Sequence, residues 1–203
     1  MVSRVRKRLS AQERRARILA AAVHAFARDG YDSTKMDGIA ARAEITKPVL
    51  YDHFSSKQAL FLAVLESIRD GLISKGKSVV DGDCEPEQKF RRAVDAFLRF
   101  VEDEPDAARV LLTIPSGDPA AARVSREVQA GASAGIAALL VAFMPGSPVW
   151  RLRATSEFLK EGLHALAVWW LENPGKTRDE IVDVVMRIVW PGLQAGAQTT
   201  ETP

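Results

Sequence analysis

The residues best suited to chemistry lie close together in the sequence, between positions 34 and 57. They combine Lys, His, Tyr and Thr, which donate hydrogen bonds, with small apolar side chains, as a DNA-contacting surface does. Lys47 can donate to guanine O6 and N7, and Pro48 or Val49 can touch a thymine methyl group. The other donors suit phosphate oxygens, which set affinity and register. The candidate DNA-contact residues are Thr34, Lys35, Thr46, Lys47, Pro48, Val49, Tyr51, His53 and Lys57.

Two short helices and a turn must position these side chains. Apolar residues at helical spacing predict one helix near 35–43 and another near 47–54, joined by a four-residue turn at 43–46. Leu50 and Phe54 lie one turn apart and face inward, so the polar face of the second helix points outward. This arrangement predicts a helix-turn-helix whose second helix enters a major groove.

The starts of these helices carry residues typical of helix caps. Thr34 is predicted to cap the first short helix and Thr46 the second. Ser55 and Gln58 have the spacing of a capping box that opens a longer helix. The exposed backbone N–H groups at such helix starts suit phosphate oxygens.

The charge of the chain is divided unevenly. The overall formal charge is +2, but residues 1–57 hold 12 Lys and Arg against 6 Asp and Glu, whereas residues 58–203 hold 16 against 20. A basic N-terminal part indicates contact with a polyanion. Arg4, Arg6, Lys7 and Arg8 form a basic arm over 1–9 that can follow a DNA backbone or minor groove.

The rest of the chain repeats the helical pattern, with no stretch that alternates with period two. Ser10 with Glu13 and Thr177 with Glu180 form further capping boxes, and Pro191 is predicted to stop the last helix. We expect an all-α fold of about nine helices: an N-terminal three-helix helix-turn-helix domain joined to a larger helical domain. The predicted domains are a basic arm over 1–9, the DNA-binding domain over 10–55 and the C-terminal domain over 56–203.

Composition excludes several classes of protein. One cysteine in 203 residues rules out a disulfide framework and favours a reducing compartment. No uncharged apolar run is long enough to cross a membrane. We therefore expect a cytoplasmic protein without a membrane partner.

The segment over 30–57 resembles the DNA-binding domain of the TetR family of bacterial transcriptional regulators. The resemblance covers roughly residues 10–65 and implies a two-domain, all-α homodimer that binds a small molecule and represses in its ligand-free form. Glu44 departs from the pattern, because the family most often has glycine in this turn; a positive φ there would store strain of order 1 kcal/mol. The resemblance rests on Gly30, Tyr31, Thr34, Ile39, Ala40, Ala43, Ile45, Thr46, Lys47, Leu50, Tyr51, His53, Phe54 and Lys57.

Two further groups of residues are assigned roles in the C-terminal half. The last helix is apolar nearly all round and, with the preceding helix, predicts a four-helix dimer interface; a monomeric core is the alternative. Aromatic residues with one arginine could line an apolar effector pocket, although aromatic residues at helical spacing more often belong to an ordinary core. The interface residues are Phe158, Leu159, Leu163, Leu166, Trp170, Val185, Ile188 and Val189, and the pocket residues are Phe97, Phe100, Arg109, Phe143, Trp150 and Trp169.

No group of residues indicates catalysis, a metal site or a cofactor. The three histidines lie far apart, and Cys84 lies in an acidic loop that disfavours its thiolate. The sequence, together with the family resemblance, therefore predicts a non-enzymatic regulator, namely a repressor that is released from a palindromic operator by an apolar or amphipathic effector. The alternative is a helical ligand-binding or scaffold protein that binds nucleic acid only nonspecifically.

Overall fold

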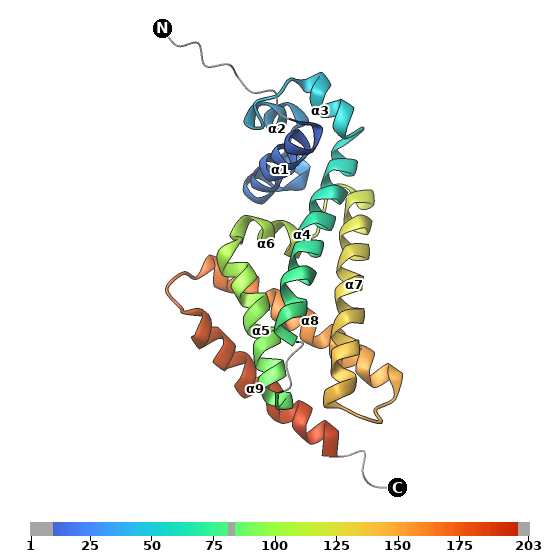
Figure 1. Ribbon diagram of the computed structural model, residues 1–203, viewed down its shortest axis with the longest axis vertical. Coiled ribbons are helices and arrows are strands. Elements are labelled where there is room, and N and C mark those ends of the chain that lie inside the picture. Colours follow the sequence, from blue (N-terminus) through green and yellow to red (C-terminus); the bar gives the residue numbers. More distant parts are fainter. Residues whose placement is uncertain (1–9, 81–83, 199–203) are drawn as a thin grey trace.

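The computed structural model describes residues 10–80 and 84–198, so the basic arm over 1–9 lies outside the described residues. Within these ranges the chain forms nine helices and no strand, which confirms the predicted all-α fold (Figure 1). The helices are α1 (Ala11–Ser33), α2 (Met36–Arg42), α3 (Lys47–His53), α4 (Lys57–Val80), α5 (Pro86–Asp103), α6 (Pro105–Leu112), α7 (Pro119–Phe143), α8 (Val149–Glu172) and α9 (Arg178–Gln198).

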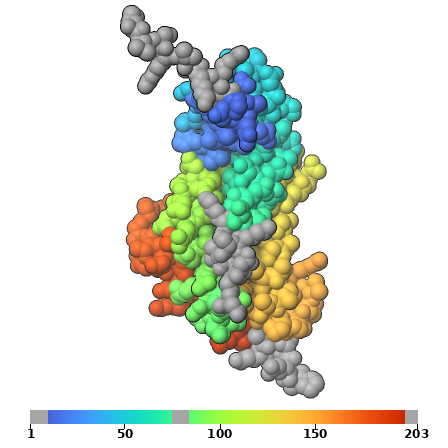
Figure 2. Space-filling view, in the orientation of Figure 1, coloured from blue at the N-terminus to red at the C-terminus, as the bar shows by residue number. Residues whose placement is uncertain are grey.

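Helices α1 to α3 form the head, which occupies one end of an elongated molecule (Figures 1 and 2). The Ser10–Glu13 capping box opens α1 as predicted, with Glu13 N donating to Ser10 Oγ at 3.1 Å. Gly30 interrupts the helical backbone with a φ of 73°, and α1 continues beyond this kink to Ser33. The kink re-aims the end of α1 toward the rest of the molecule.

Helix α4 starts beside the head and runs into the body, which consists of α5 to α9 (Figure 1). Phe61 of α4 packs edge-on against Phe26 at 5.3 Å between ring centroids and lies 4.7 Å from the Tyr31 ring. These aromatic contacts tie α4 to the head. Ser56, not the predicted Ser55, accepts a hydrogen bond from the first turn of α4, from Ala59 N at 3.0 Å.

The body is a bundle in which α7 pairs with α8, and α5 packs against both α4 and α9. The Thr177–Glu180 capping box opens α9 as predicted. The prediction that Pro191 ends this helix is wrong, because α9 continues to Gln198. Leu193, only 5% exposed, anchors the segment beyond Pro191 in the core, and this burial offsets the backbone hydrogen bond that proline cannot donate.

Among the described helices, none is long and apolar enough to cross a membrane.

Candidate nucleic-acid interface

Helix α3 presents one face to the core and the opposite face to solvent. Leu50 is fully buried and Phe54 nearly so, as the sequence predicted. On the other side Lys47 and Pro48 are exposed and Tyr51 is 43% exposed. Val49 and His53 are half-buried at the edges of this face. The outward face therefore carries an ammonium, a ring hydroxyl and apolar surface, which can all reach base edges and backbone in a major groove.

The turn before α3 holds a residue in the left-handed region of the backbone. Glu44 has a φ of 52°, the strained conformation that the missing glycine suggested. Ile45 N donates to Ala40 O at 3.0 Å and closes the turn. The Glu44 carboxylate forms an ion pair with Arg17 of α1, so the side chain that causes the strain also ties the turn to the first helix.

Lys47, the first residue of α3, reaches back to α2. Its Nζ lies 2.8 Å from Oδ1 and 3.1 Å from Oδ2 of Asp37. Hydrogen bonding and the negative charge of Asp37 raise the pKa of Lys47, so the ammonium stays charged. Asp37 is not among the predicted contact residues, although an acid in the first turn of α2 can reach the start of α3.

Lys57, which is predicted to contact phosphate, is turned inward in this structure. Its Nζ donates to the carbonyl oxygens of Tyr31 at 2.8 Å, Asp32 at 3.2 Å and Thr34 at 3.2 Å. The ammonium also lies 4.4 Å from the centre of the Tyr31 ring. These contacts satisfy carbonyl groups at the end of α1, so Lys57 holds α1 and α4 together.

Thr34 does not occupy the N-cap position of α2 that is predicted for it. Its side chain is buried, and its hydroxyl donates to Gly30 O at 2.6 Å. It is the C-cap of α1, whereas Lys35 occupies the N-cap position of α2. Thr46 does occupy the N-cap of α3, but its hydroxyl makes no capping hydrogen bond and is exposed. Thr46 and Lys35 are thus available to phosphate oxygens.

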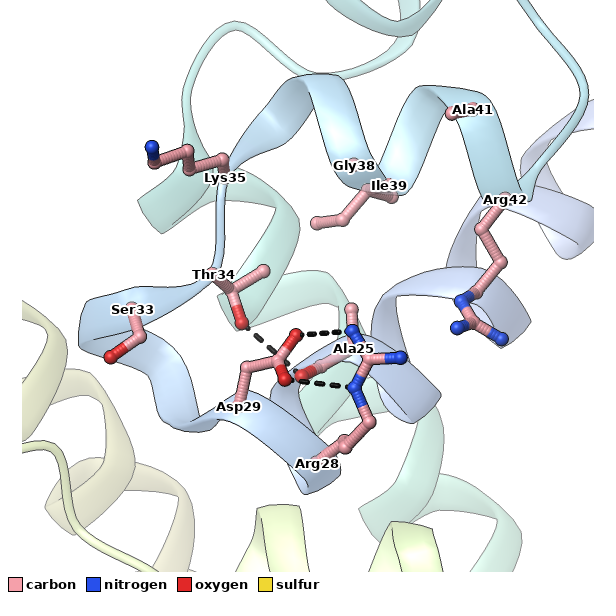
Figure 3. Close-up of a pocket in the computed structure, with 10 residues that line it drawn as sticks. All are labelled: Ala25, Arg28, Asp29, Ser33, Thr34, Lys35, Gly38, Ile39, Ala41 and Arg42. Atoms are coloured by element: carbon pink, nitrogen blue, oxygen red, sulfur yellow. Dashed lines mark hydrogen bonds and ion pairs between the residues drawn. The ribbon is translucent and has the colours of Figure 1, made fainter.

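A hollow of about 550 Å³ lies between α1 and α2, beside this surface (Figure 3). Arg28 and Asp29 pair along one wall, and Arg42 contributes a further guanidinium from the end of α2. Lys35 points away from the Arg28–Asp29 pair. Arg28 and Arg42 are not among the predicted contact residues, although both contribute to the excess of basic residues over 1–57.

Three polar contacts join the head to the body. Tyr31 Oη donates to Asp118 Oδ2 at 3.0 Å, and Gly117 N donates to Asp32 Oδ2 at 2.9 Å. Burial, together with the Asp118 carboxylate, raises the pKa of Tyr31. His24 Nδ1 lies 2.8 Å from Asp106 Oδ2 of α6. Any movement of α6 or of the loop before α7 must therefore strain or break contacts with α1.

The residues predicted to line an effector pocket lie in different surroundings in the structure. Trp150 is 67% exposed, and Trp169 is also exposed. Phe97 stacks on His164 at 6.0 Å, and burial lowers the pKa of that histidine. Phe100 is buried in the core, while Phe143 packs edge-on against Phe90 and Trp190.

Arg109 alone of the six borders a described cavity, of about 180 Å³, where α1, α6 and α8 meet. Helical spacing located apolar positions in the body but did not distinguish a cavity wall from ordinary core.

The predicted interface residues divide into two groups. Phe158 and Ile188 are each 72% exposed, and Leu163, Leu166 and Val189 are half-buried. Leu159, Trp170 and Val185 are buried within the chain itself, where they belong to its hydrophobic core. These three side chains expose little surface in a single chain, so the predicted interface depends mainly on the first group.

The interior of the body contains polar side chains that the sequence did not reveal. Gln129 of α7 is buried and donates to Leu111 O of α6 at 2.8 Å. Lys160 of α8 is buried, and its Nζ lies 2.8 Å from Glu157 and 3.2 Å from Glu161. Burial lowers the pKa of Lys160, but the hydrogen bonds that its ammonium donates to these carboxylates outweigh burial, so the net shift of the pKa is upward. In the part of the chain that is described, no cluster of His, Cys, Asp and Glu could hold a metal ion.

Known proteins resemble this chain in sequence and in structure. Residues 18–64 match the bacterial regulatory proteins of the tetR family. FasR, an HTH-type transcriptional activator from Mycolicibacterium smegmatis, is 33% identical over 196 residues, which cover 92% of this chain and 85% of FasR.

The similar solved structures extend over nearly the whole chain. A TetR-like transcriptional regulator from Rhodococcus sp. RHA1 is 27% identical, with a TM-score of 0.76 over 92% of this chain and 98% of the other. FadR from Bacillus subtilis, solved in complex with stearoyl-CoA, shares the fold at 16% identity, with a TM-score of 0.72 over 89% of this chain and 98% of FadR. The outward face of α3 agrees with these similarities. Because residues 18–64 match the tetR family and FasR is similar over most of this chain, the chain belongs to the TetR family of bacterial DNA-binding transcriptional regulators.

Proposed function

We propose that this regulator acts as a homodimer that represses transcription from a palindromic operator and leaves it when a small apolar or amphipathic effector binds. The observation that carries the proposal is the outward face of α3, where Lys47 and Tyr51 are exposed while Leu50 fixes the helix to the core. In this proposal residues 10–55 contact DNA and residues 56–203 bind the effector and the second subunit.

Exposed apolar side chains on α8 and α9 support the dimer. Phe158 and Trp169 lie three turns apart on α8, with the small residues Gly162 and Ala165 between them, and Ile188 lies on α9. Large apolar groups that remain exposed at helical spacing are typical of a helix-packing interface. A two-fold dimer would set two α3 helices about 34–36 Å apart, the spacing of successive major-groove faces on one side of the DNA.

Helix α6 is the proposed route from effector to DNA. It contacts the body through Gln129 and Leu111, and the head through Asp106 and His24. An effector that displaces α6 would rotate the head and change the spacing of the two α3 helices. By thermodynamic reciprocity, operator DNA must then weaken effector binding by the same factor.

Acyl-CoA thioesters are the first effectors to test. FadR from Bacillus subtilis, which shares the fold, was solved in complex with stearoyl-CoA, and the mainly apolar interior found here suits a long apolar chain. Fluorescence anisotropy of an operator duplex, titrated with stearoyl-CoA and with free CoA, tests this class. Release by the thioester alone supports the proposal, whereas no effect of either compound removes acyl-CoA from consideration.

An anisotropy titration of the protein's own promoter region against random DNA tests sequence-specific binding. At about 0.15 M salt a regulator holds its operator at least about 1,000-fold more tightly than random DNA. Equal affinities would favour the nonspecific scaffold alternative.

A reporter gene behind the same promoter tests the sign of regulation. Repression predicts a higher signal when this gene is deleted. Activation is the second candidate, because FasR is named an activator, and it predicts a lower signal.

A further inference from the structure

Asp37 stands out on the surface of the head because its charge opposes that of DNA. Its side chain is 66% exposed, and it contacts the ammonium of Lys47, the first residue of α3. A carboxylate on a surface that meets phosphate groups weakens binding to any DNA sequence. The contacts of the carboxylate must therefore provide an advantage that offsets this weaker DNA binding.

A purely structural role explains only part of the arrangement. An acid in the first turn of α2 is favourable beside the helix N-terminus. That role requires no contact with α3, yet both carboxylate oxygens of Asp37 lie within 3.1 Å of Lys47 Nζ. The contact fixes the end of a flexible side chain at the beginning of the helix that faces the DNA.

The pair places a hydrogen-bond acceptor next to a donor. The Lys47 ammonium has three N–H donors, and the carboxylate leaves at least one of them free; each Asp37 oxygen keeps an unused lone pair. In the major groove a G·C pair presents guanine O6 and N7 as acceptors and cytosine N4 as a donor on the neighbouring base. The fixed ammonium of Lys47 can donate to the guanine acceptors, while the adjacent Asp37 carboxylate can accept from cytosine N4.

We infer that Asp37 and Lys47 read one G·C base pair in each half-site as a unit, with Lys47 donating to guanine and Asp37 accepting from cytosine N4. Asp37 is thus a specificity residue that also positions Lys47. The inference rests on the proposed operator binding. It predicts that removal of Asp37 makes binding less selective although the surface becomes more positive.

The experiment starts from a pool of random-sequence duplexes, because the operator is not known. The full-length protein selects its preferred duplex from this pool. Anisotropy then measures the affinity for that duplex and for every single-base-pair variant of it. The proteins compared are wild type, Asp37→Ala, Asp37→Asn, Lys47→Ala and the double variant Asp37→Ala/Lys47→Ala.

Asp52→Ala is the control that is matched in charge. It removes an exposed acid from α3 itself and so produces the same change in net charge. Thermal unfolding of each variant shows whether it is folded. Asp37→Asn retains the size of the side chain and so controls for any change that Asp37→Ala makes in α2.

The expected result is local in the DNA sequence. Asp37→Ala and Asp37→Asn should each reduce the preference at one G·C pair per half-site by about tenfold, while preferences at the other positions persist. Affinity for random duplexes should rise in Asp37→Ala and in Asp52→Ala alike. On the Lys47→Ala background, removal of Asp37 should change the preference by less than about twofold, because the two residues act together.

Two different failures can be distinguished. A pool from which no sequence is enriched would overturn the proposed operator binding and this inference with it. If a sequence is enriched, but Asp37→Ala and Asp37→Asn keep every base preference or lower the affinity for all duplexes alike, the inference is overturned and operator binding stands.

Discussion

The head and the body are both built from helices, but the exposed faces of these helices differ in polarity. In the head, the short helices are held in place by a few buried apolar side chains, and their polar face is free to contact a partner. Leu50 and Tyr51 of α3 illustrate the two faces. In the body, long helices are apolar on more than one side, and Val185 and Ile188 of α9 lie in the core and in solvent respectively. A polar face therefore identifies an interaction surface directly, whereas an apolar face can belong to the core or to a partner.

Substitutions on α9 should show the largest effects and divide the body into these two classes. Val185→Glu buries an unpaired charge and should destabilise the fold by about 3 kcal/mol. Ile188→Glu places the same charge in solvent and should leave the helical content intact while converting a dimer into a monomer. Urea unfolding followed by circular dichroism, with light scattering for mass, measures both.

The α9 comparison fails if Val185→Glu unfolds at the wild-type urea concentration. It also fails if Ile188→Glu remains a dimer, since the exposed face of α9 would then not be the interface.

Lysines of the head should differ according to where their ammonium groups lie. Lys57→Ala leaves three carbonyl groups at the end of α1 without their charged donor and should cost about 2 kcal/mol. Lys35→Ala, the matched variant at an exposed position, should change stability by less than about 0.5 kcal/mol and weaken binding to all DNA sequences similarly. Equal stability losses in the two variants would contradict the inward position of Lys57.

Acid should loosen the body through the contacts between α5 and α9. Arg178 Nε donates to Asp95 Oδ1 at 2.8 Å; burial raises the pKa of Asp95, but the hydrogen bonds from Arg178 and Arg99 outweigh it, so the net shift is downward. The folded-state pKa therefore lies below the unfolded value of about 4. The stabilisation is complete above that value and is lost as pH falls through the folded-state pKa.

The variant Arg178→Gln tests this pH dependence. Its free energy of unfolding should lie below that of wild type at neutral pH, by a modest amount because the pair is partly exposed. The difference should shrink as the pH falls below about 4. A difference that is independent of pH would show that the charge of Asp95 does not take part.

Glu44→Gly should have the smallest effect. Glycine accepts a φ of 52° without strain, which gains about 1 kcal/mol, but the substitution removes the ion pair with Arg17 and adds chain entropy to the unfolded state. The two contributions oppose each other, so the melting temperature should change by only a few degrees. A large loss of stability would mean that the Arg17–Glu44 ion pair outweighs the backbone strain.

The sequence predicted the head better than the body, for a physical reason. The spacing of Leu50 and Phe54 is a local pattern, and it placed α3 and its outward face correctly. The inward turn of Lys57 was not predictable, because its carbonyl partners lie 23 to 26 residues earlier and meet it only through the packing of α1 on α4.

In the body the helical period located buried positions but did not identify their neighbours. Trp150 and Trp169, assigned to a pocket, are exposed, and Leu159, assigned to an interface, is in the core. Aromatic and apolar residues satisfy either role equally well. Only the packing of α5 to α9 decides between them, and that packing depends on contacts distant in sequence.

The central claim is that the head reads the DNA sequence while the body forms the dimer. The most direct test compares Lys47→Ala with Ile188→Glu on a duplex selected by the wild-type protein and on its single-base-pair variants. Lys47→Ala should remain a dimer in light scattering and lose its base preference at one pair per half-site. Ile188→Glu should be a monomer that binds the duplex more weakly but ranks the base variants as wild type does. Unchanged base preferences in Lys47→Ala, or wild-type affinity in Ile188→Glu, would contradict the account.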